Sequence, residues 1–197
     1  MQIRQMQKEK TKQKLIETAF KVFSQKGIMS TRISDIAKEA GVSHGAVFVH
    51  FASQEMLIAE VISVYGHKIA TRTHQMAEED ACLADVLRAH IDVLSEYEPF
   101  YTRLVLENRL LPTVARDTWV TIQSAVSFHF SQAVKREWGN ETPIPVHMLF
   151  NIWMGLVHYY ISNSDLFAPK GSVLSRCGGE LMDAYLKLID KGVVGSG

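Results

Sequence analysis

Apolar residues between Lys10 and Lys26 recur at the period of an α-helix and mark one buried face. The residues on that face are Leu15, Ile16, Ala19, Phe20, Val22 and Phe23. Gly27 follows and supplies a C-terminal stop. The pattern therefore predicts a long first helix.

Two short helices with a tight turn between them are predicted next. Thr31 can cap the first helix, and Gly41 ends it. Its inward positions follow the spacing i, i+3, i+4, i+7: Ile33, Ile36, Ala37 and Ala40. Ser43 caps the following helix after about three residues. This spacing is typical of a helix-turn-helix, whose second helix enters the major groove of DNA.

The second helix of this pair has two different faces on a helical wheel. Val47 and Phe51 are four residues apart and point toward the small core. The opposite face carries the small side chains Gly45, Ala46 and Val49, and such a flat face fits deep in a groove. A short helix buried on both faces would show the same apolar residues.

Helical periodicity continues to the end of the chain. A long helix is predicted from 54 to 76, and further helices at about 83–97, 99–110, 113–138, 146–163 and 172–191, separated at "EEDA", "YEPF", "LLPT", "WGNETPIP" and "APKGS". The fold class is therefore all-α with about nine helices. Residues 1–53 form a helix-turn-helix domain and residues 54–197 a larger helical domain, of which 54–76 is a linker helix.

Charge is distributed unevenly, although the net charge is zero. Residues 1–54 contain nine Lys and Arg against four Asp and Glu, whereas residues 55–197 contain 12 against 17. A basic module on an acidic body is typical of a protein whose first part faces phosphates. A solvated basic helix would produce a similar split.

The composition narrows the class of protein further. The most apolar stretch, "MLFNIWMGLVHYYI", is short for a membrane span, and the start of the chain lacks the apolar run of a secretory signal, so we expect a cytoplasmic protein that does not bind membranes. The histidines form no H-E-x-x-H motif, and neither a nucleophile elbow nor a phosphate loop is present. We therefore expect no enzyme activity, no catalytic residue, no metal and no cofactor.

The run "TRISDIAKEAGVSHGAVFVHFASQEML", preceded by "LIETAFKVFSQKGIMS", resembles the N-terminal DNA-binding domain of the TetR family of bacterial transcriptional regulators. The positions that carry the resemblance are Thr31, Ile36, Ala37, Ala40, Gly41, Val42, Ser43, Gly45, His50, Phe51 and Leu57. Two positions depart from the family pattern: Phe48 stands where a tyrosine is usual, and Gln54 where a lysine is usual. Both usual residues contact phosphate in the family.

The wheel and the resemblance together give the residues expected to contact DNA. They are Thr31, Arg32, Ser43, His44, Gly45, Ala46, Phe48, Val49, His50 and Gln54, with Lys8, Lys10, Lys12 and Lys14 at longer range. Ala46 and Val49 would contact thymine methyl groups, whereas Arg32 and His44 can bond to base edges.

Two apolar helices predict an interface between two subunits. The helix 146–163 is apolar on nearly all sides and needs cover on both faces. The resemblance implies that it pairs with the last helix in a homodimer that binds a palindromic operator. The expected interface residues are Phe150, Met154, Val157, Leu174, Cys177, Leu181, Tyr185 and Leu188. A monomer in which both helices are central is the alternative.

The resemblance also implies a small-molecule effector, bound in the larger domain. The candidate residues for its pocket are Tyr97, Phe100, Tyr101, Trp119, Phe128, His129 and Trp153, which would suit an apolar or aromatic compound but fit an aromatic core equally well. The expected function is a dimeric repressor that the effector releases from DNA. A DNA-binding regulator without an effector, controlled by a protein partner, is the alternative.

Overall fold

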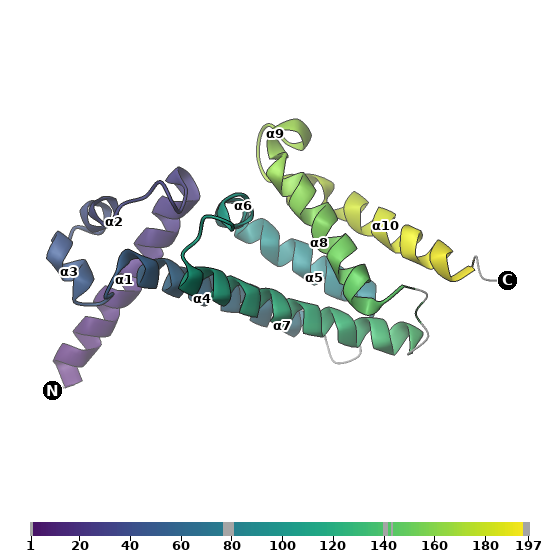
Figure 1. Ribbon diagram of the computed structural model, residues 1–197, viewed down its shortest axis with the longest axis horizontal. Helices are drawn as coiled ribbons and strands as arrows, with labels where there is room; N and C mark the ends of the chain where they lie inside the picture. The colour runs from purple at the N-terminus through teal and green to yellow at the C-terminus, as the bar shows by residue number, and fades with distance from the viewer. Residues whose placement is uncertain (1, 77–80, 140–141, 143, 195–197) are drawn as a thin grey trace. The chain divides into compact units, whose positions relative to one another are not determined.

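A computed structural model describes residues 2–76, 81–139, 142 and 144–194. The described residues form ten helices and no strand, which confirms the all-α class (Figure 1). The helices are α1 (Gln2–Lys26), α2 (Ile33–Ala40), α3 (His44–Phe48), α4 (Gln54–Met76), α5 (Leu83–Glu96), α6 (Glu98–Glu107), α7 (Thr113–Trp138), α8 (Val146–Ser162), α9 (Ser164–Phe167) and α10 (Val173–Val194).

Two differences from the predicted helices stand out. The first helix begins at Gln2 rather than at Lys10, and the four-residue helix α9 was not expected. The breaks predicted at 78–81 and 138–145 lie partly outside the described residues.

The chain forms two compact units. Unit 1 contains Met1–Gly66 and Pro99–Val120, and unit 2 contains His67–Glu98 and Thr121–Gly197. Residues 99–120 therefore cluster with the helix-turn-helix, and the domain boundary predicted after residue 53 stays a prediction.

In unit 1, α1, α2 and α3 enclose a small apolar core. Val47 and Phe51 are buried, as the helical wheel predicts, and Ile36 is fully buried beside them in the same core. Ser43 Oγ accepts a hydrogen bond from Ala46 N–H at 3.2 Å, which confirms the cap of α3. Gly41, with φ of 67°, ends α2 in the left-handed region that favours glycine. The local signals of the sequence thus place α3 on the surface of unit 1.

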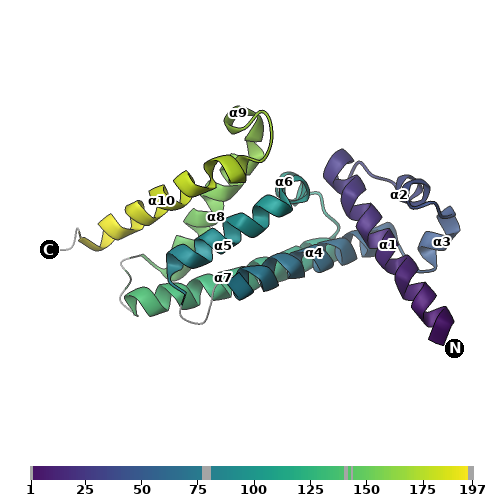
Figure 2. The same ribbon diagram turned by 180° about the vertical axis from the view of Figure 1, so that it is seen from behind.

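In unit 2, α10 packs against α5 and α8, and α8 lies beside α10 in both views (Figure 1, Figure 2). The N-terminus of α10 is held by Glu98, which is 6% exposed. Its carboxylate accepts hydrogen bonds from Val173 N–H at 2.7 Å, from Leu174 N–H at 3.0 Å and from the Ser172 hydroxyl. A carboxylate here satisfies amides that the helix itself cannot pair.

Among the helices the structure describes, none has the length and apolarity to cross a membrane.

Candidate nucleic-acid interface and effector region

The exposed side chains of α3 and of its C-cap residue, Val49, are nearly free of charge. Phe48 is 45% exposed and Val49 67%, and His44 and Gly45 are also exposed. The rings of His44 and Phe48 lie 5.2 Å apart, so they are neighbours within this exposed group. At Gly45 an added Cβ would meet no atom within 4 Å. The backbone at Gly45 can therefore approach a surface closely.

Thr31 is placed inside unit 1 and not among these exposed side chains. It is 1% exposed, and its hydroxyl donates to the carbonyl of Gly27 at 2.6 Å. The hydroxyl closes the loop between α1 and α2, and the expectation that Thr31 contacts DNA stays a prediction.

Gln54, at the start of α4, is half-buried. Its Nε2 donates a hydrogen bond to the carbonyl of Thr31 at 2.9 Å. The side chain at this position thus ties α4 to the residue that precedes α2. One N–H of the amide is used in this bond, and the second N–H is the one that remains for a phosphate.

Two other expected DNA contacts differ in their surroundings. Arg32 is exposed beside the first turn of α2, where it can reach outward. His50 is half-buried, and its Nδ1 is buried without a hydrogen-bond partner in the described part of the chain. A buried ring nitrogen without a partner is costly, so this imidazole gains from any donor that reaches it.

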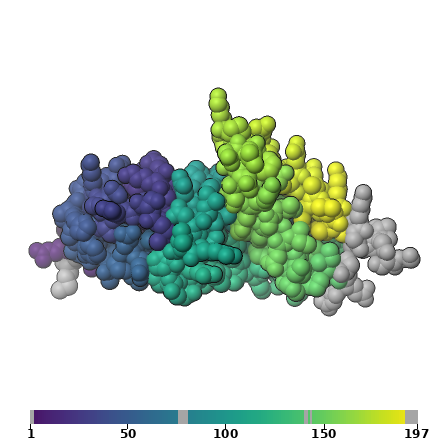
Figure 3. All heavy atoms as spheres, turned by 45° about the horizontal axis from the view of Figure 1, so that its top comes forward, coloured from purple at the N-terminus to yellow at the C-terminus, as the bar shows by residue number. Residues whose placement is uncertain are grey.

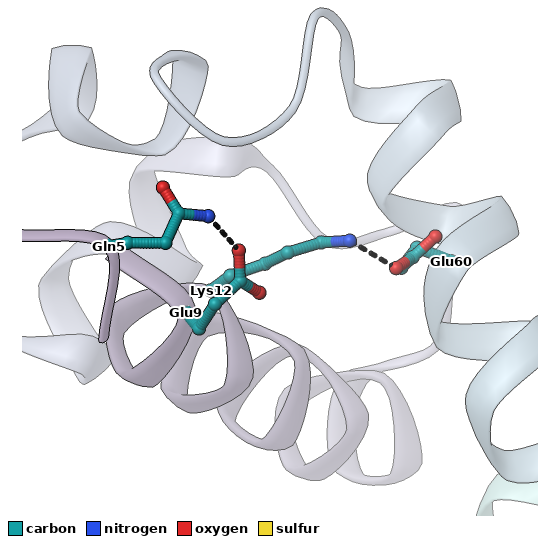
Figure 4. A network of polar contacts seen from close by, with 4 residues as sticks. All are labelled: Gln5, Glu9, Lys12 and Glu60. Atoms are coloured by element: carbon teal, nitrogen blue, oxygen red, sulfur yellow. Dashed lines mark hydrogen bonds and ion pairs between the residues drawn. The ribbon is translucent and has the colours of Figure 1, made fainter. Parts of the chain in front are cut away.

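The basic residues of α1 have two different roles. Lys8, Lys10 and Lys14 are exposed along the helix. Lys12 instead reaches from α1 to Glu60 of α4, with Nζ 2.5 Å from Oε1 (Figure 4). Its ammonium also lies 5.8 Å from the centre of the Phe51 ring. Lys12 therefore stabilises the packing of α1 on α4, and the other three of the four lysines expected near DNA remain on the surface.

The seven residues proposed for an effector pocket fall into different units. Phe100, Tyr101 and Trp119 belong to unit 1, where the rings of Tyr101 and Trp119 meet edge to face at 5.4 Å. Those in unit 2 are Tyr97, Phe128, His129 and Trp153, of which Phe128 is 59% exposed and Trp153 1%. Phe100, Tyr101, Trp119 and Trp153 are buried, whereas Tyr97 and His129 are half-buried and Phe128 lies at the surface.

A buried histidine pair in unit 2 was missed at the sequence level. His90 of α5 is 3% exposed, and its Nδ1 accepts a hydrogen bond from Trp153 Nε1 at 3.2 Å. Burial, together with the charge of His158, lowers the pKa of His90 to about 4, and burial lowers the pKa of His158 to about 4. Both imidazoles are therefore neutral at pH 7. The signal in the sequence was a single histidine within the apolar face of α5.

A second pair of imidazoles lies nearer the surface of unit 2. The rings of His74 and His129 stack at 4.4 Å. Burial and the charge of His74 lower the pKa of His129. Among the described residues no group of three or more His, Cys, Asp and Glu side chains is arranged to hold a metal ion.

Most residues expected at the subunit interface are buried within the chain itself. The buried ones are Phe150, Met154, Val157, Leu174, Leu181 and Tyr185. Tyr185 even donates its hydroxyl to the carbonyl of Leu149 at 2.9 Å. These six side chains pack inside unit 2, whereas Cys177 is half-buried and Leu188 is 66% exposed; that the eight residues form a subunit interface stays a prediction.

Comparison with known proteins bears on the first part of the chain and on its fold. Residues 15–61 match the model of the bacterial regulatory proteins, tetR family. The uncharacterized HTH-type transcriptional regulator YuxN of Bacillus subtilis is 31% identical over 150 residues, which cover 73% of this chain and 52% of YuxN. The probable acrEF/envCD operon repressor of Escherichia coli is 32% identical over 91 residues, 46% of this chain and 34% of that protein. The chain thus spans about half of the first relative and a third of the second.

Solved structures share the fold over most of the chain. The transcriptional regulator FadR from Bacillus subtilis, solved in complex with stearoyl-CoA, superimposes with a TM-score of 0.73 at 16% identity and covers 88% of this chain and 96% of its own. The TetR family regulator PfmR from Thermus thermophilus gives 0.67 at 23% identity, with 89% and 96% covered. At these identities the likeness concerns the fold alone.

Proposed function

This chain belongs to the TetR family of bacterial regulatory proteins, and from that premise we propose that it is a dimeric repressor released from a palindromic operator by a small apolar or aromatic effector. The observation that carries the proposal is the group of exposed, uncharged side chains on α3 and its C-cap. Exposed apolar side chains on a capped helix beside basic residues suit a major groove, because the helix approaches base edges while the lysines neutralise phosphates.

Selection of duplexes from a random library by the full chain tests DNA recognition. The enriched sequences should be palindromes whose half-sites lie about one helical turn apart, or a multiple of it. Val49→Glu places a carboxylate on the exposed face of α3 and should abolish binding. The control Val120→Glu changes a comparably exposed valine of α7 and should bind like the wild type. Failure to enrich any sequence would refute the proposal.

An exposed apolar stripe of α8 supports a dimer. Met148, Ile152, Gly155 and Tyr159 follow the spacing i, i+4, i+7, i+11 and are all exposed, opposite the buried face of the helix. Leu188 of α10 is 66% exposed. The atoms of α8 and α10, green and yellow in Figure 3, lie side by side at the surface of unit 2. A second copy that covers this stripe would remove it from water.

Sedimentation of a matched pair of variants tests the dimer. Ile152→Glu should shift the protein toward the monomer at micromolar concentration, because it places a charge within the stripe. Leu166→Glu changes a leucine of α9 that is even more exposed, 70% against 41% for Ile152, and should remain dimeric. A wild-type protein that sediments as a monomer would contradict this part of the proposal.

A thermal-shift screen tests the effector. Binding to the native state alone raises the free energy of unfolding by about 2.7 kcal/mol at a hundredfold excess over Kd. Stearoyl-CoA and a set of uncharged aromatic compounds are suitable probes. The compound that raises the melting temperature should also release the selected operator. No shift with any probe would favour the alternative, control by a protein partner.

A further inference from the structure

Glu107, the last residue of α6, binds the loop that joins α1 to the helix-turn-helix. Its Oε2 accepts a hydrogen bond from Met29 N–H at 2.7 Å, and its Oε1 accepts one from Ile28 N–H at 3.3 Å. One helical turn earlier, Arg103 Nη2 donates to the carbonyl of Gln25 at 3.3 Å. All these residues belong to unit 1, so α6 holds both the last turn of α1 and the loop after it.

Gly27 makes the approach of the carboxylate possible. Its φ of 96° lies in the left-handed region, and an added Cβ would stand 2.8 Å from Glu107 Oε1. Any larger residue would be strained in this conformation and would also push the carboxylate away. The glycine therefore serves this contact as well as the end of α1.

The loop held by Glu107 is itself closed by a hydrogen bond and is bonded to the start of α4, the helix that follows α3. The Thr31 hydroxyl donates to the carbonyl of Gly27, and Gln54 Nε2 donates to the carbonyl of Thr31. Gln54 is the first residue of α4, and Thr31 lies two residues before α2. Hydrogen bonds thus join α6 to the loop, and the loop to the first residue of α4, the helix that follows α3.

We propose that Glu107 is a positioning residue for DNA binding, which fixes the orientation of the helix-turn-helix on α6 by holding the amides of Ile28 and Met29. The proposal rests on the proposed function, because it concerns a dimer on a palindromic operator. On such an operator, once one subunit has bound its half-site, the α3 of the second subunit is held close to the other half-site, which raises its effective concentration there. This gain requires that the α3 helices of both subunits are held in the required orientation. Binding to a single half-site makes no such demand.

The experiment compares the affinity of the full chain for the selected palindrome and for a duplex that carries one half-site. Glu107→Ala is expected to bind the palindrome at least about tenfold more weakly, about 1.4 kcal/mol, while its affinity for the half-site stays within about twofold of the wild type. Glu107→Gln keeps one carbonyl oxygen for Met29 N–H, so its affinity for the palindrome should lie between those of Glu107→Ala and the wild type. Glu17→Ala removes the same charge from an exposed position of α1 and should match the wild type on both duplexes.

Equal losses on both duplexes would overturn the inference, because they would mean that Glu107 only keeps the helix-turn-helix folded. Unchanged or tighter binding of the palindrome would overturn it too. Circular dichroism checks the fold, and where Glu107→Ala loses helix the comparison is made with Glu107→Gln. Wild-type protein that enriches no operator, or does not prefer the palindrome, refutes the proposed function instead, and the inference falls with it.

Discussion

The buried imidazole of His90 should make the stability of the protein depend on pH between about 7 and 4. In the folded chain burial lowers the pKa of His90 to about 4, with the charge of His158 as a second cause. In the unfolded chain a histidine titrates near the ordinary value of about 6.5. As the pH falls, the unfolded chain therefore takes up the proton first, and the free energy of unfolding decreases. The stability is complete above pH 6.5 and is lost progressively toward pH 4.

The magnitude follows from these two values. Between pH 7.5 and 5 a histidine with pKa values of about 6.5 unfolded and about 4 folded lowers the free energy of unfolding by about 2 kcal/mol. His158 has a similarly lowered pKa and adds to the decrease. Carboxylates also change the free energy of unfolding in this pH range, so the contribution of His90 must be isolated with a variant.

His90→Asn is the variant that isolates it. The asparagine oxygen can occupy the place of Nδ1 and accept the hydrogen bond from Trp153 Nε1, but it cannot be protonated. Urea unfolding at pH 7.5 and pH 5 should show that His90→Asn loses about 2 kcal/mol less than the wild type. His147→Asn changes an exposed histidine of α8 and should keep the wild-type decrease. Equal decreases in His90→Asn and wild type would refute the reasoning.

Three further substitutions test single contacts. Glu98→Gln removes the charge that holds the first amides of α10 and should lower the free energy of unfolding by about 1–3 kcal/mol in urea. Gly178→Ala should cost about 1–3 kcal/mol in the same assay, because its Cβ would overlap a methyl carbon of Ile91, whereas Gly179→Ala, which meets no atom within 4 Å, should be neutral or stabilising. Gln54→Lys should steepen the salt dependence of DNA binding by about one unit per subunit, read from affinities at several salt concentrations; an unchanged slope would mean that no phosphate lies within its reach.

The helix-turn-helix could be predicted from the sequence because its signals are local. Gly41 and Ser43 define the turn, and the apolar spacing of the two helices defines their buried face. The beginning of α1 could not be predicted in the same way, since its first turns bury nothing: Ile3 is 79% exposed and Met6 70%. Helical periodicity arises from burial, so an exposed extension of a helix leaves no such pattern.

The face of α8 that is free for a partner could not be chosen from the sequence either. A helix that is apolar on nearly all sides gives two candidate stripes, and the one named from the sequence includes Met154 and Val157. Tertiary packing decides between them, because α10 covers that stripe and leaves Ile152 and Tyr159 exposed. The histidine pair was missed for a related reason, since the partners of His90 come from another helix, far away in the sequence.

The same distinction between local and tertiary contacts changes how this chain must hold DNA. From the sequence alone, the side chains of Lys12, Thr31 and Gln54 were candidates for contacts with phosphate. In the structure each of them makes a hydrogen bond or ion pair inside unit 1. The exposed side chains of α3 carry no charge. They can therefore distinguish base edges, but they contribute little to the electrostatic attraction between the protein and the DNA phosphates. In the proposed complex with DNA, we expect the attraction to come from Arg32 and from the exposed lysines of α1. We therefore expect affinity and specificity to be carried by different residues.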